Sequence, residues 1–178
     1  IWENLSSFSG TVFPVNAKRA EILGVKAFSS IAALPEVPEL VIIVTPASTV
    51  PQIVEEAGVA GVKAVVVISA GFKETGAAGA ELEKRVLEAA KRHGVRLIGP
   101  NCLGLMNPHA GLNATFASSM ARPGRVAFLS QSGALCTAIL DWSHDQHVGF
   151  SAFVSTGAMT DVGWGDLIRH FGNDPNTE

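Results

Sequence analysis

Three short apolar runs in this chain each end in a turn that carries polar side chains. The pairs of run and turn are Leu97-Ile98 with Gly99-Pro100-Asn101-Cys102, Val65–Ile68 with Ser69-Ala70-Gly71, and Val126–Leu129 with Ser130-Gln131-Ser132-Gly133. In an open parallel sheet, ligands bind beyond the carboxyl ends of the strands. Asparagine at such an end offers both donors and acceptors. Each turn alone could be a plain connection, but three of them together favour the edge of a ligand site.

The stretch Ser130-Gln131-Ser132-Gly133 lies between an expected strand and an expected helix. Backbone N–H groups at a helix start, with two hydroxyls nearby, can hold an anion such as phosphate. The competing interpretation is a nucleophilic serine. A nucleophile elbow needs glycine two residues before and two after the serine, whereas Ser130 and Ala134 take these places around Ser132. The sequence therefore favours a phosphate site over a hydrolase.

Two further turns follow expected strands and carry polar groups. Asn16, Lys18 and Arg19 come after the run Thr11–Val15, and cations at a ligand edge suit a phosphate group. Thr45-Pro46 ends the run Leu40–Val44 and would supply a wall and a hydroxyl. The alternatives, a solvated turn and a simple strand terminator, stay open for these two positions.

Other reactive side chains form no recognisable centre. His144 and His147 are spaced to share a helix face, yet no acidic residue or cysteine joins them at a metal-ligand spacing. The glutamates of the expected helices are interpreted as surface charges; they are Glu55, Glu56, Glu81, Glu83 and Glu88. Cys102 and Cys136 are too few and too far apart for a disulfide framework or a zinc knuckle. We expect two reduced thiols and no metal site.

The composition is that of a folded protein in a reducing compartment. Of the 178 residues, 47% are hydrophobic and 16% charged, which is enough apolar material for a buried core. A net charge of −3 without a long basic run makes nucleic acid a poor candidate partner. No apolar run approaches the roughly 20 residues of a membrane span, and no signal-peptide pattern stands at Ile1. We therefore expect a cytoplasmic protein that does not contact a membrane.

The elements that must position these residues alternate between strand and helix. Expected strands are Thr11–Val15, Leu40–Val44, Lys63–Ile68, Val95–Ile98, Val126–Leu129 and Phe150–Val154. Expected helices are Ile1–Phe8, one capped by Ser48 and closed by Gly58 and Gly61, then Ala80–His93, Gly133–His144 and Trp164–Phe171, with one helical turn at Ser30–Leu34. Such alternation with short links predicts a parallel, doubly wound α/β sheet.

The chain is expected to divide in two. Leu105–Ser119 has no clear period and is interpreted as an irregular excursion, and Arg122-Pro123-Gly124 is interpreted as a link. The expected domains are residues 1–121 and 125–178. The chain starts inside a helical pattern and stops in a turn, which predicts a fragment of a longer protein.

Six stretches occur in the order seen in NDP-forming acyl-CoA synthetases. They are Val12–Asn16, Gly24–Ala27, Val44–Pro46, Ile68–Glu74, Gly99–Gly104 and Ser130–Leu135. The whole chain resembles this superfamily, which includes ADP-forming acetyl-CoA synthetase and the α subunit of succinyl-CoA synthetase. The pieces G-P-N-C and S-Q-S-G carry the most specific part of the resemblance.

The resemblance implies a fold and two sites. A Rossmann-like CoA-binding domain lacking its first strand would be followed by the first half of a flavodoxin-like α/β domain. The implied CoA site is lined by Asn16, Lys18, Thr45, Pro46, Ile68, Ser69, Ala70, Asn101 and Cys102. The implied loop for a phosphohistidine is Ser130, Gln131, Ser132 and Gly133.

The implied reaction interconverts acid, CoA and ATP with acyl-CoA, ADP and phosphate. Its cofactors are CoA and ATP or ADP with Mg. Its partners are a small carboxylic acid and a nucleotide-grasp domain or subunit, in a homo- or hetero-oligomer. The family's Gly-rich CoA loop would lie before Ile1 and its phosphohistidine beyond Glu178, so the stretch alone is not expected to catalyse the reaction.

Two other interpretations stay open. Gly111–Phe116 and Ile139–Ser143 resemble the synthetase-like part of bacterial protein lysine acetyltransferases. That resemblance implies a CoA-binding regulatory module, and the residues downstream would decide between module and enzyme. An NAD-dependent dehydrogenase is the weakest interpretation, because no glycine fingerprint followed by an acidic residue is present.

Overall fold

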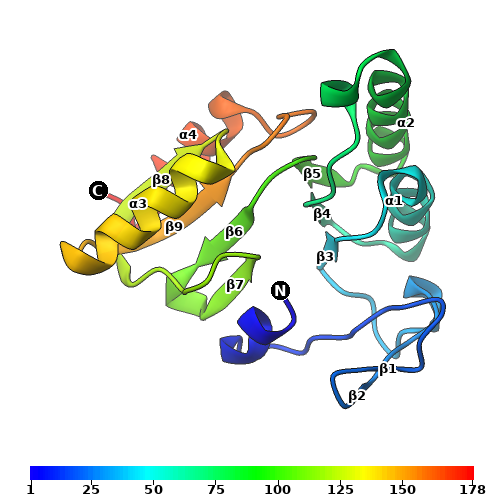
Figure 1. The fold of residues 1–178 in the computed structure, drawn as a ribbon, viewed down its shortest axis with the longest axis horizontal. Coiled ribbons are helices and arrows are strands. Elements are labelled where there is room, and N and C mark those ends of the chain that lie inside the picture. Colours follow the sequence, from blue (N-terminus) through cyan, green and yellow to red (C-terminus); the bar gives the residue numbers. More distant parts are fainter.

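Two β-sheets with separate hydrophobic cores lie side by side in the computed structural model, which describes residues 1–178 (Figure 1). Helices cover both sheets, so the α/β class predicted from the sequence is confirmed. None of these helices is both long and apolar enough to cross a membrane.

The first sheet consists of three parallel strands in sequence order, β3 (Leu40–Ile43), β4 (Ala64–Val67) and β5 (Arg96–Ile98). The helices α1 (Val50–Ala60) and α2 (Ala77–His93) pack against each other on one face of it (Figure 1). Because the strand order advances in one direction, right-handed crossovers place both helices on the same face. The doubly wound arrangement is therefore wrong for these three strands.

Each of the two helices ends at a glycine. Gly61 and Gly94 both adopt the left-handed conformation just after a helix, at φ 91° and 68°, which glycine reaches without a steric penalty. At the start of α1 the expected cap is wrong: Thr49, not Ser48, is the N-cap residue, and its hydroxyl donates to Pro46 O at 2.7 Å.

The N-terminal segment is less regular than expected. The first helix is a short 3₁₀ helix, Glu3–Ser7, in which Leu5 N donates to both Ile1 O and Trp2 O. Thr11–Val15 is not a strand and forms only the bridge between Val15 and Phe28, since Pro14 has no N–H to donate to a ladder. A small hairpin of β1 (Glu21–Ile22) and β2 (Val25–Lys26) follows, and a 3₁₀ turn at Ile31–Ala33 confirms the expected helical turn.

The second sheet has the strand order β7-β6-β9-β8. Its strands are β6 (Gly104–Asn107), β7 (Leu112–Thr115), β8 (Pro123–Ser130) and β9 (Phe150–Ser155). β8 and β9 are parallel, while β6 runs antiparallel to β7 and β9. A 3₁₀ turn at Pro108–Ala110 joins β6 to β7.

The hairpin of β6 and β7 replaces the irregular excursion expected over residues 105–119, which is wrong. The strand pattern was hidden because two buried residues of β7 are polar. Asn113 and Thr115 are 2% and 0% exposed, and the Thr115 hydroxyl donates to Asn113 Oδ1 at 2.7 Å. Paired in this way, polar side chains can occupy core positions.

The predicted link at Arg122–Gly124 is wrong as a boundary between sheets. β8 begins at Pro123, and the second sheet joins strands from both sides of this link. By strand pairing, the division falls between β5 and β6, at residues 99–103. That residues 1–121 and 125–178 are separate domains stays a prediction.

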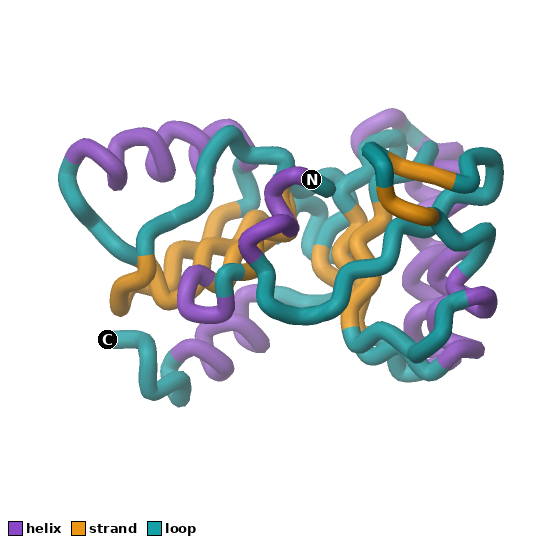
Figure 2. The backbone as a smooth tube through the Cα atoms, turned by 90° about the horizontal axis from the view of Figure 1, so that it is seen from below, coloured by secondary structure: helices purple, strands orange, loops and turns teal.

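The helices α3 (Gly133–Asp145) and α4 (Trp164–Phe171) lie on opposite faces of the second sheet (Figure 2). On one face, Cys136 and Leu140 of α3 pack against Phe150 and Phe153. On the other face, Leu167 of α4 packs against Ala152 and Val154. All strands and helices predicted for residues 126–171 are confirmed.

Candidate functional site

The ends of the three strands of the first sheet are joined by hydrogen bonds. After β4, the Ser69 hydroxyl donates to Thr45 O, which follows β3, at 2.5 Å. The Asn101 N–H, which follows β5, donates to Ser69 O at 3.0 Å. Parallel strands bring their carboxyl ends to one edge, and these bonds lock the three turns together there.

The turn after β5 presents an asparagine to solvent. Asn101 is exposed and adopts the left-handed conformation at φ 54°, which asparagine tolerates better than most residues. No hydrogen bond within the protein uses its side-chain amide, so both its donor and its acceptor are available to a ligand. Pro46 and Ala70 are exposed at the same edge.

Two of the expected site residues lie partly or wholly beneath this edge. Cys102 is 5% exposed, and its thiol donates to Val67 O at 3.3 Å. Burial raises the pKa of the Cys102 thiol to about 12, so it stays protonated and unreactive at neutral pH. Ile68 is half-buried, and its N–H donates to Ile43 O. These side chains support the turns from below.

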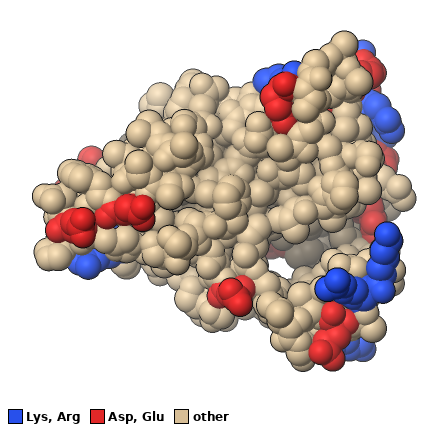
Figure 3. Space-filling model, in the orientation of Figure 1, with Lys and Arg blue, Asp and Glu red and all other residues tan.

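Asn16 and Lys18 are not joined to the three strand ends by any hydrogen bond. Asn16 Oδ1 accepts from the N–H groups of Lys18 and Arg19 at 2.9 and 3.0 Å, which shapes the turn itself. Figure 3 shows Lys and Arg side chains next to Asp and Glu side chains at the lower right, over the part of the chain that contains the hairpin of β1 and β2, and a hollow between this part and the rest. Hydrogen bonds thus join Thr45, Ser69 and Asn101 to one another, whereas those of Asn16 Oδ1 stay within its own turn.

The loop Ser130–Gly133 connects β8 to α3, as expected. Ser132 is the N-cap, and its hydroxyl oxygen accepts from Leu135 N at 3.1 Å. The first N–H groups of a helix have no partner inside the helix, which leaves those of Gly133 and Ala134 for an anion. The helix dipole adds roughly half a positive charge at this end.

The two serines of this loop have different roles. Ser132 is exposed, whereas Ser130 is 7% exposed, and its hydroxyl oxygen accepts from Ser132 N at 3.1 Å. The Ser130 hydroxyl therefore stabilises the loop rather than pointing at a ligand, which corrects the expectation that both hydroxyls donate. Beneath the loop, burial raises the pKa of the Cys136 thiol, so this cysteine also stays protonated.

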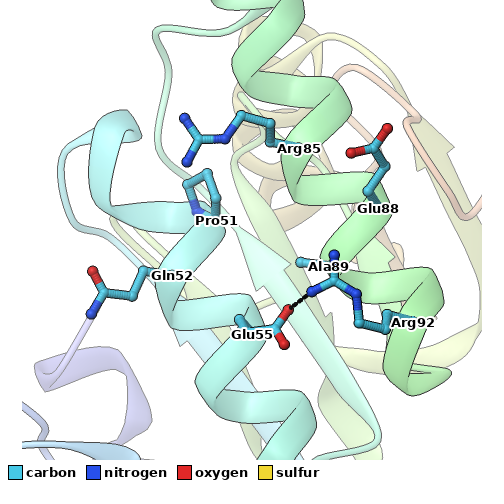
Figure 4. Close-up of a pocket in the computed structure, with 7 residues that line it drawn as sticks. All are labelled: Pro51, Gln52, Glu55, Arg85, Glu88, Ala89 and Arg92. Atoms are coloured by element: carbon cyan, nitrogen blue, oxygen red, sulfur yellow. Dashed lines mark hydrogen bonds and ion pairs between the residues drawn. The ribbon is translucent and has the colours of Figure 1, made fainter.

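A separate hollow lies between α1 and α2 and contains none of the expected site residues (Figure 4). Five of the side chains that line it are polar: Gln52, Glu55, Arg85, Glu88 and Arg92. Arg92 and Glu55 are paired with each other at 2.5 Å. Because its charges are largely neutralised by one another, we interpret this hollow as the groove between two surface helices. No cluster of His, Cys, Asp and Glu could hold a metal ion.

One carboxylate that the sequence placed on the surface is buried. Glu83 of α2 is 7% exposed and accepts a hydrogen bond from the hydroxyl of Thr160, in the segment between β9 and α4. The spacing of Gly79, Glu83, Val86 and Ala90 puts all four on the buried face of α2. That spacing is the signal that could have identified Glu83.

Two protein families match two separate parts of the chain. Residues 1–108 match the family described as CoA binding domain. Residues 123–178 match the family described as succinyl-CoA ligase like flavodoxin domain. The first match covers more than half of the chain.

Full-length relatives are much longer than this chain. It is 48% identical over 178 residues to acetate–CoA ligase (ADP-forming) I of Archaeoglobus fulgidus, all of this chain and 26% of the relative. It is 46% identical over 171 residues to the α subunit of acetate–CoA ligase (ADP-forming) II of Pyrococcus furiosus, 96% of this chain and 37% of that subunit. The chain therefore spans about a quarter to two fifths of these relatives.

A solved structure with the same fold is the dinucleotide-forming acetyl-coenzyme A synthetase 1 of Candidatus Korarchaeum cryptofilum, in complex with phosphate and ADP. It superimposes with a TM-score of 0.93 at 38% identity, over 99% of this chain and 38% of that one.

Proposed function

The chain belongs to the CoA-binding domain family, and from this premise we propose that it is the CoA-binding part of an NDP-forming acyl-CoA synthetase. The observation that carries the proposal is that hydrogen bonds join the turns after β3, β4 and β5 at one edge of the first sheet. There Ser69 bonds to both Thr45 and Asn101, and the Asn101 amide is left free at the carboxyl ends of three parallel strands. Ligands of open α/β sheets bind at such an edge.

Coenzyme A would lie across this edge. The proposed contact residues are Asn16, Lys18, Thr45, Pro46, Ile68, Ser69, Ala70, Asn101 and Cys102. Asn101 would donate and accept hydrogen bonds, and Thr45 and Pro46 would form a wall. Lys18 carries a positive charge suited to a CoA phosphate. Cys102 and Ile68 would contribute by shaping the turns from beneath.

Phosphate would be held at the start of α3. The N–H groups of Gly133 and Ala134, the dipole of α3 and the exposed hydroxyl of Ser132 form a donor set that fits a phosphoryl group. Gln131 is exposed in the same loop, and no acidic side chain is part of it. A phosphohistidine from beyond Glu178 would be held here by positioning and charge stabilisation.

The complete protein would interconvert acid, CoA and ATP with acyl-CoA, ADP and phosphate. ATP or ADP with Mg would bind outside this chain, on a nucleotide-grasp domain or subunit. This is supported by relatives described as ADP-forming acetate–CoA ligases, one of them a separate α subunit, and by a related structure that contains ADP and phosphate. A small carboxylic acid is the second substrate, the protein would act in the cytoplasm, and assembly into an oligomer is part of the proposal.

A CoA-binding regulatory module of a lysine acetyltransferase is the alternative, and no comparison favours it. The two candidates differ in one assay, the formation of acyl-CoA from acid, CoA and ATP by the full-length protein. A synthetase produces acyl-CoA, ADP and phosphate in equal amounts, whereas a regulatory module produces none.

The CoA site is tested by calorimetric titration of the full-length protein with CoA. Replacing Asn101 by glycine removes the amide and still allows φ 54°. We expect Asn101→Gly to weaken CoA binding about tenfold, the effect of one or two lost hydrogen bonds. Asn176→Gly, in the C-terminal turn, is the control and retains the affinity. Absence of binding to the wild-type protein at millimolar CoA would remove the proposal.

A further inference from the structure

The buried carboxylate of Glu83 lies where the two sheets meet. Its Oε1 accepts from the Thr160 hydroxyl at 2.5 Å and lies 3.3 Å from Lys73 Nζ, and its Oε2 accepts from Lys73 N at 3.3 Å. A buried carboxylate is costly unless it is paired and hydrogen-bonded. Here its donors come from two parts of the chain, Lys73 before α2 and Thr160 after β9. Burial of this charge therefore depends on the contact between the two sheets.

Thr160 belongs to a segment that we call the bridging segment, residues 155–162. In Figure 1 the orange loop between β9 and α4 reaches towards the green chain next to α2. Within this segment, Thr156 N donates to Ser130 O at 2.8 Å, and Ala158 N donates to Pro100 O at 2.9 Å. The bridging segment thus contacts both the turn that carries Asn101 and the loop Ser130–Gly133, which we call the phosphate loop.

The contact with the Asn101 turn is tight. Gly157 has φ 56°, and a Cβ atom there would collide with the carbonyl oxygen of Pro100 and lie 2.6 Å from that of Asn101. Three residues after Gly157, Thr160 N donates to Gly99 O at 3.2 Å, and Lys73 Nζ donates to Ala158 O at 2.8 Å. From Ala158 to Thr160 the segment is therefore held by residues before β6, which are Lys73, Glu83, Gly99 and Pro100.

We infer that Glu83 is a positioning residue, which holds the bridging segment through Thr160 and so fixes the candidate CoA site relative to the phosphate loop. The inference rests on the proposed function, in which ligands at these two sites take part in one reaction. Such a reaction depends on the relative placement of its partners, and a shift of about 1 Å can lower its rate 10²-fold. Glu83 contacts neither candidate ligand site, so its effect should fall on turnover rather than on CoA affinity.

The test uses the full-length protein and the variant Thr160→Val, which removes the hydroxyl that Glu83 accepts from. We expect kcat for acyl-CoA formation to fall about tenfold or more, because the two sites are no longer held in place. The Kd for CoA, from calorimetry, stays within about twofold, since every residue at the joined strand ends is unchanged. Thr160→Ser keeps the hydroxyl and restores kcat. Glu83→Ala removes both acceptor oxygens and should resemble Thr160→Val.

Thr75→Val is the matched control. The Thr75 hydroxyl donates to Phe72 O at 2.8 Å within the turn before α2, and it has no hydrogen bond to the bridging segment. This variant should keep both kcat and Kd. The inference is overturned if Thr160→Val retains kcat within twofold, if Kd rises as much as kcat falls, or if Thr160→Ser is as impaired as Thr160→Val.

Hydrogen exchange separates this inference from the proposed function. In Thr160→Val, the amides of residues 156–162 should exchange at least about tenfold faster than in Thr75→Val, because the segment has lost its attachment to α2. If the wild-type protein forms no acyl-CoA, the proposed function fails, and exchange alone decides whether Glu83 holds the segment. Equal exchange in the two variants overturns the inference whatever the activity.

Discussion

Single residues in this chain owe their properties to burial more than to their type. Cys102 lies in the conspicuous G-P-N-C motif, yet its thiol is 5% exposed and bonds to Val67 O. Asn101, its neighbour, is exposed with a free amide. The same turn therefore contains one residue that supports the edge and one that can contact a ligand.

Cys102 predicts a dependence of stability on alkaline pH. Its pKa is raised from 9.0 to about 12 in the folded protein by burial. A group whose pKa is raised on folding contributes stability that is complete below its unfolded pKa and is lost as pH rises towards the folded value. Between pH 9 and pH 12 the free energy of unfolding should fall by about 1 kcal/mol per pH unit more in the wild type than in Cys102→Ala. Urea denaturation at pH 8 and pH 10.5 measures this difference, and parallel slopes would contradict it.

Gly133 predicts a selective effect on phosphoryl transfer. A Cβ atom at this position meets only Leu103, at 3.7 Å, so a side chain fits. Gly133→Asp places a carboxylate at the start of α3, where it repels a bound phosphate, and phosphoryl transfer in the full-length protein should fall about tenfold or more.

The isosteric variant Gly133→Asn is the control for this prediction and should retain most of the rate. CoA affinity should be unchanged in both variants. Equal turnover in the aspartate variant and the wild type would refute a phosphate site in this loop.

At the scale of elements, the start of α3 matters for ligand binding, whereas the ends of α1 and α2 matter for stability. The candidate phosphate site depends on the free N–H groups at the start of α3. The ends of α1 and α2 instead depend on a left-handed glycine, Gly61 or Gly94. At these ends backbone conformation, rather than contacts, decides which residue is tolerated.

Gly94 and Gly165 allow the effect of a left-handed backbone to be separated from the effect of steric contacts. Gly94 ends α2 at φ 68°, whereas Gly165 lies inside α4 without a positive φ, and nothing lies within 4 Å of a Cβ atom at either position. Gly94→Ala should lower the free energy of unfolding by about 1 kcal/mol because alanine is strained there. Gly165→Ala should raise it by about 0.5–1 kcal/mol. Urea denaturation of both variants checks the opposite signs, and a shared sign would contradict the argument.

At the scale of the whole molecule, the two sheets are connected by polar contacts along the edge of β5. Asp161 of the bridging segment accepts from Arg96 Nε at 2.9 Å and from Leu97 N at 2.8 Å through the same oxygen. Val162 N returns a hydrogen bond to Leu97 O at 3.1 Å. The segment after β9 thus covers an edge of the first sheet that would otherwise be unpaired.

Asp161→Ala should therefore destabilise the chain although it removes no apolar core. It leaves the N–H of the buried residue Leu97 without a partner and deprives Arg96 of an ion pair, which together cost about 2 kcal/mol. Asp141→Ala, on the exposed surface of α3, is the control and should change the free energy of unfolding by less than about 0.5 kcal/mol. Equal stability of the two variants in urea would show that the contacts of Asp161 with β5 do not stabilise the chain.

Local pattern and turn chemistry determined much of this protein from the sequence alone. Continuous apolar runs marked β3 to β5, glycines marked helix ends, and the polar turns after the runs marked Thr45, Ser69, Asn101 and Ser132. These features depend on neighbours in the chain.

The sequence did not reveal the hairpin of β6 and β7, because Asn113 and Thr115 satisfy each other's hydrogen bonds in the core. Nor did it reveal that Glu83 is buried, that the Ser130 hydroxyl is turned inward, or that residues 155–162 join the two sheets. Those features depend on partners as far apart in the chain as 77 positions for Thr160 and Glu83 and 85 positions for Lys73 and Ala158, and only the folded chain brings such partners together.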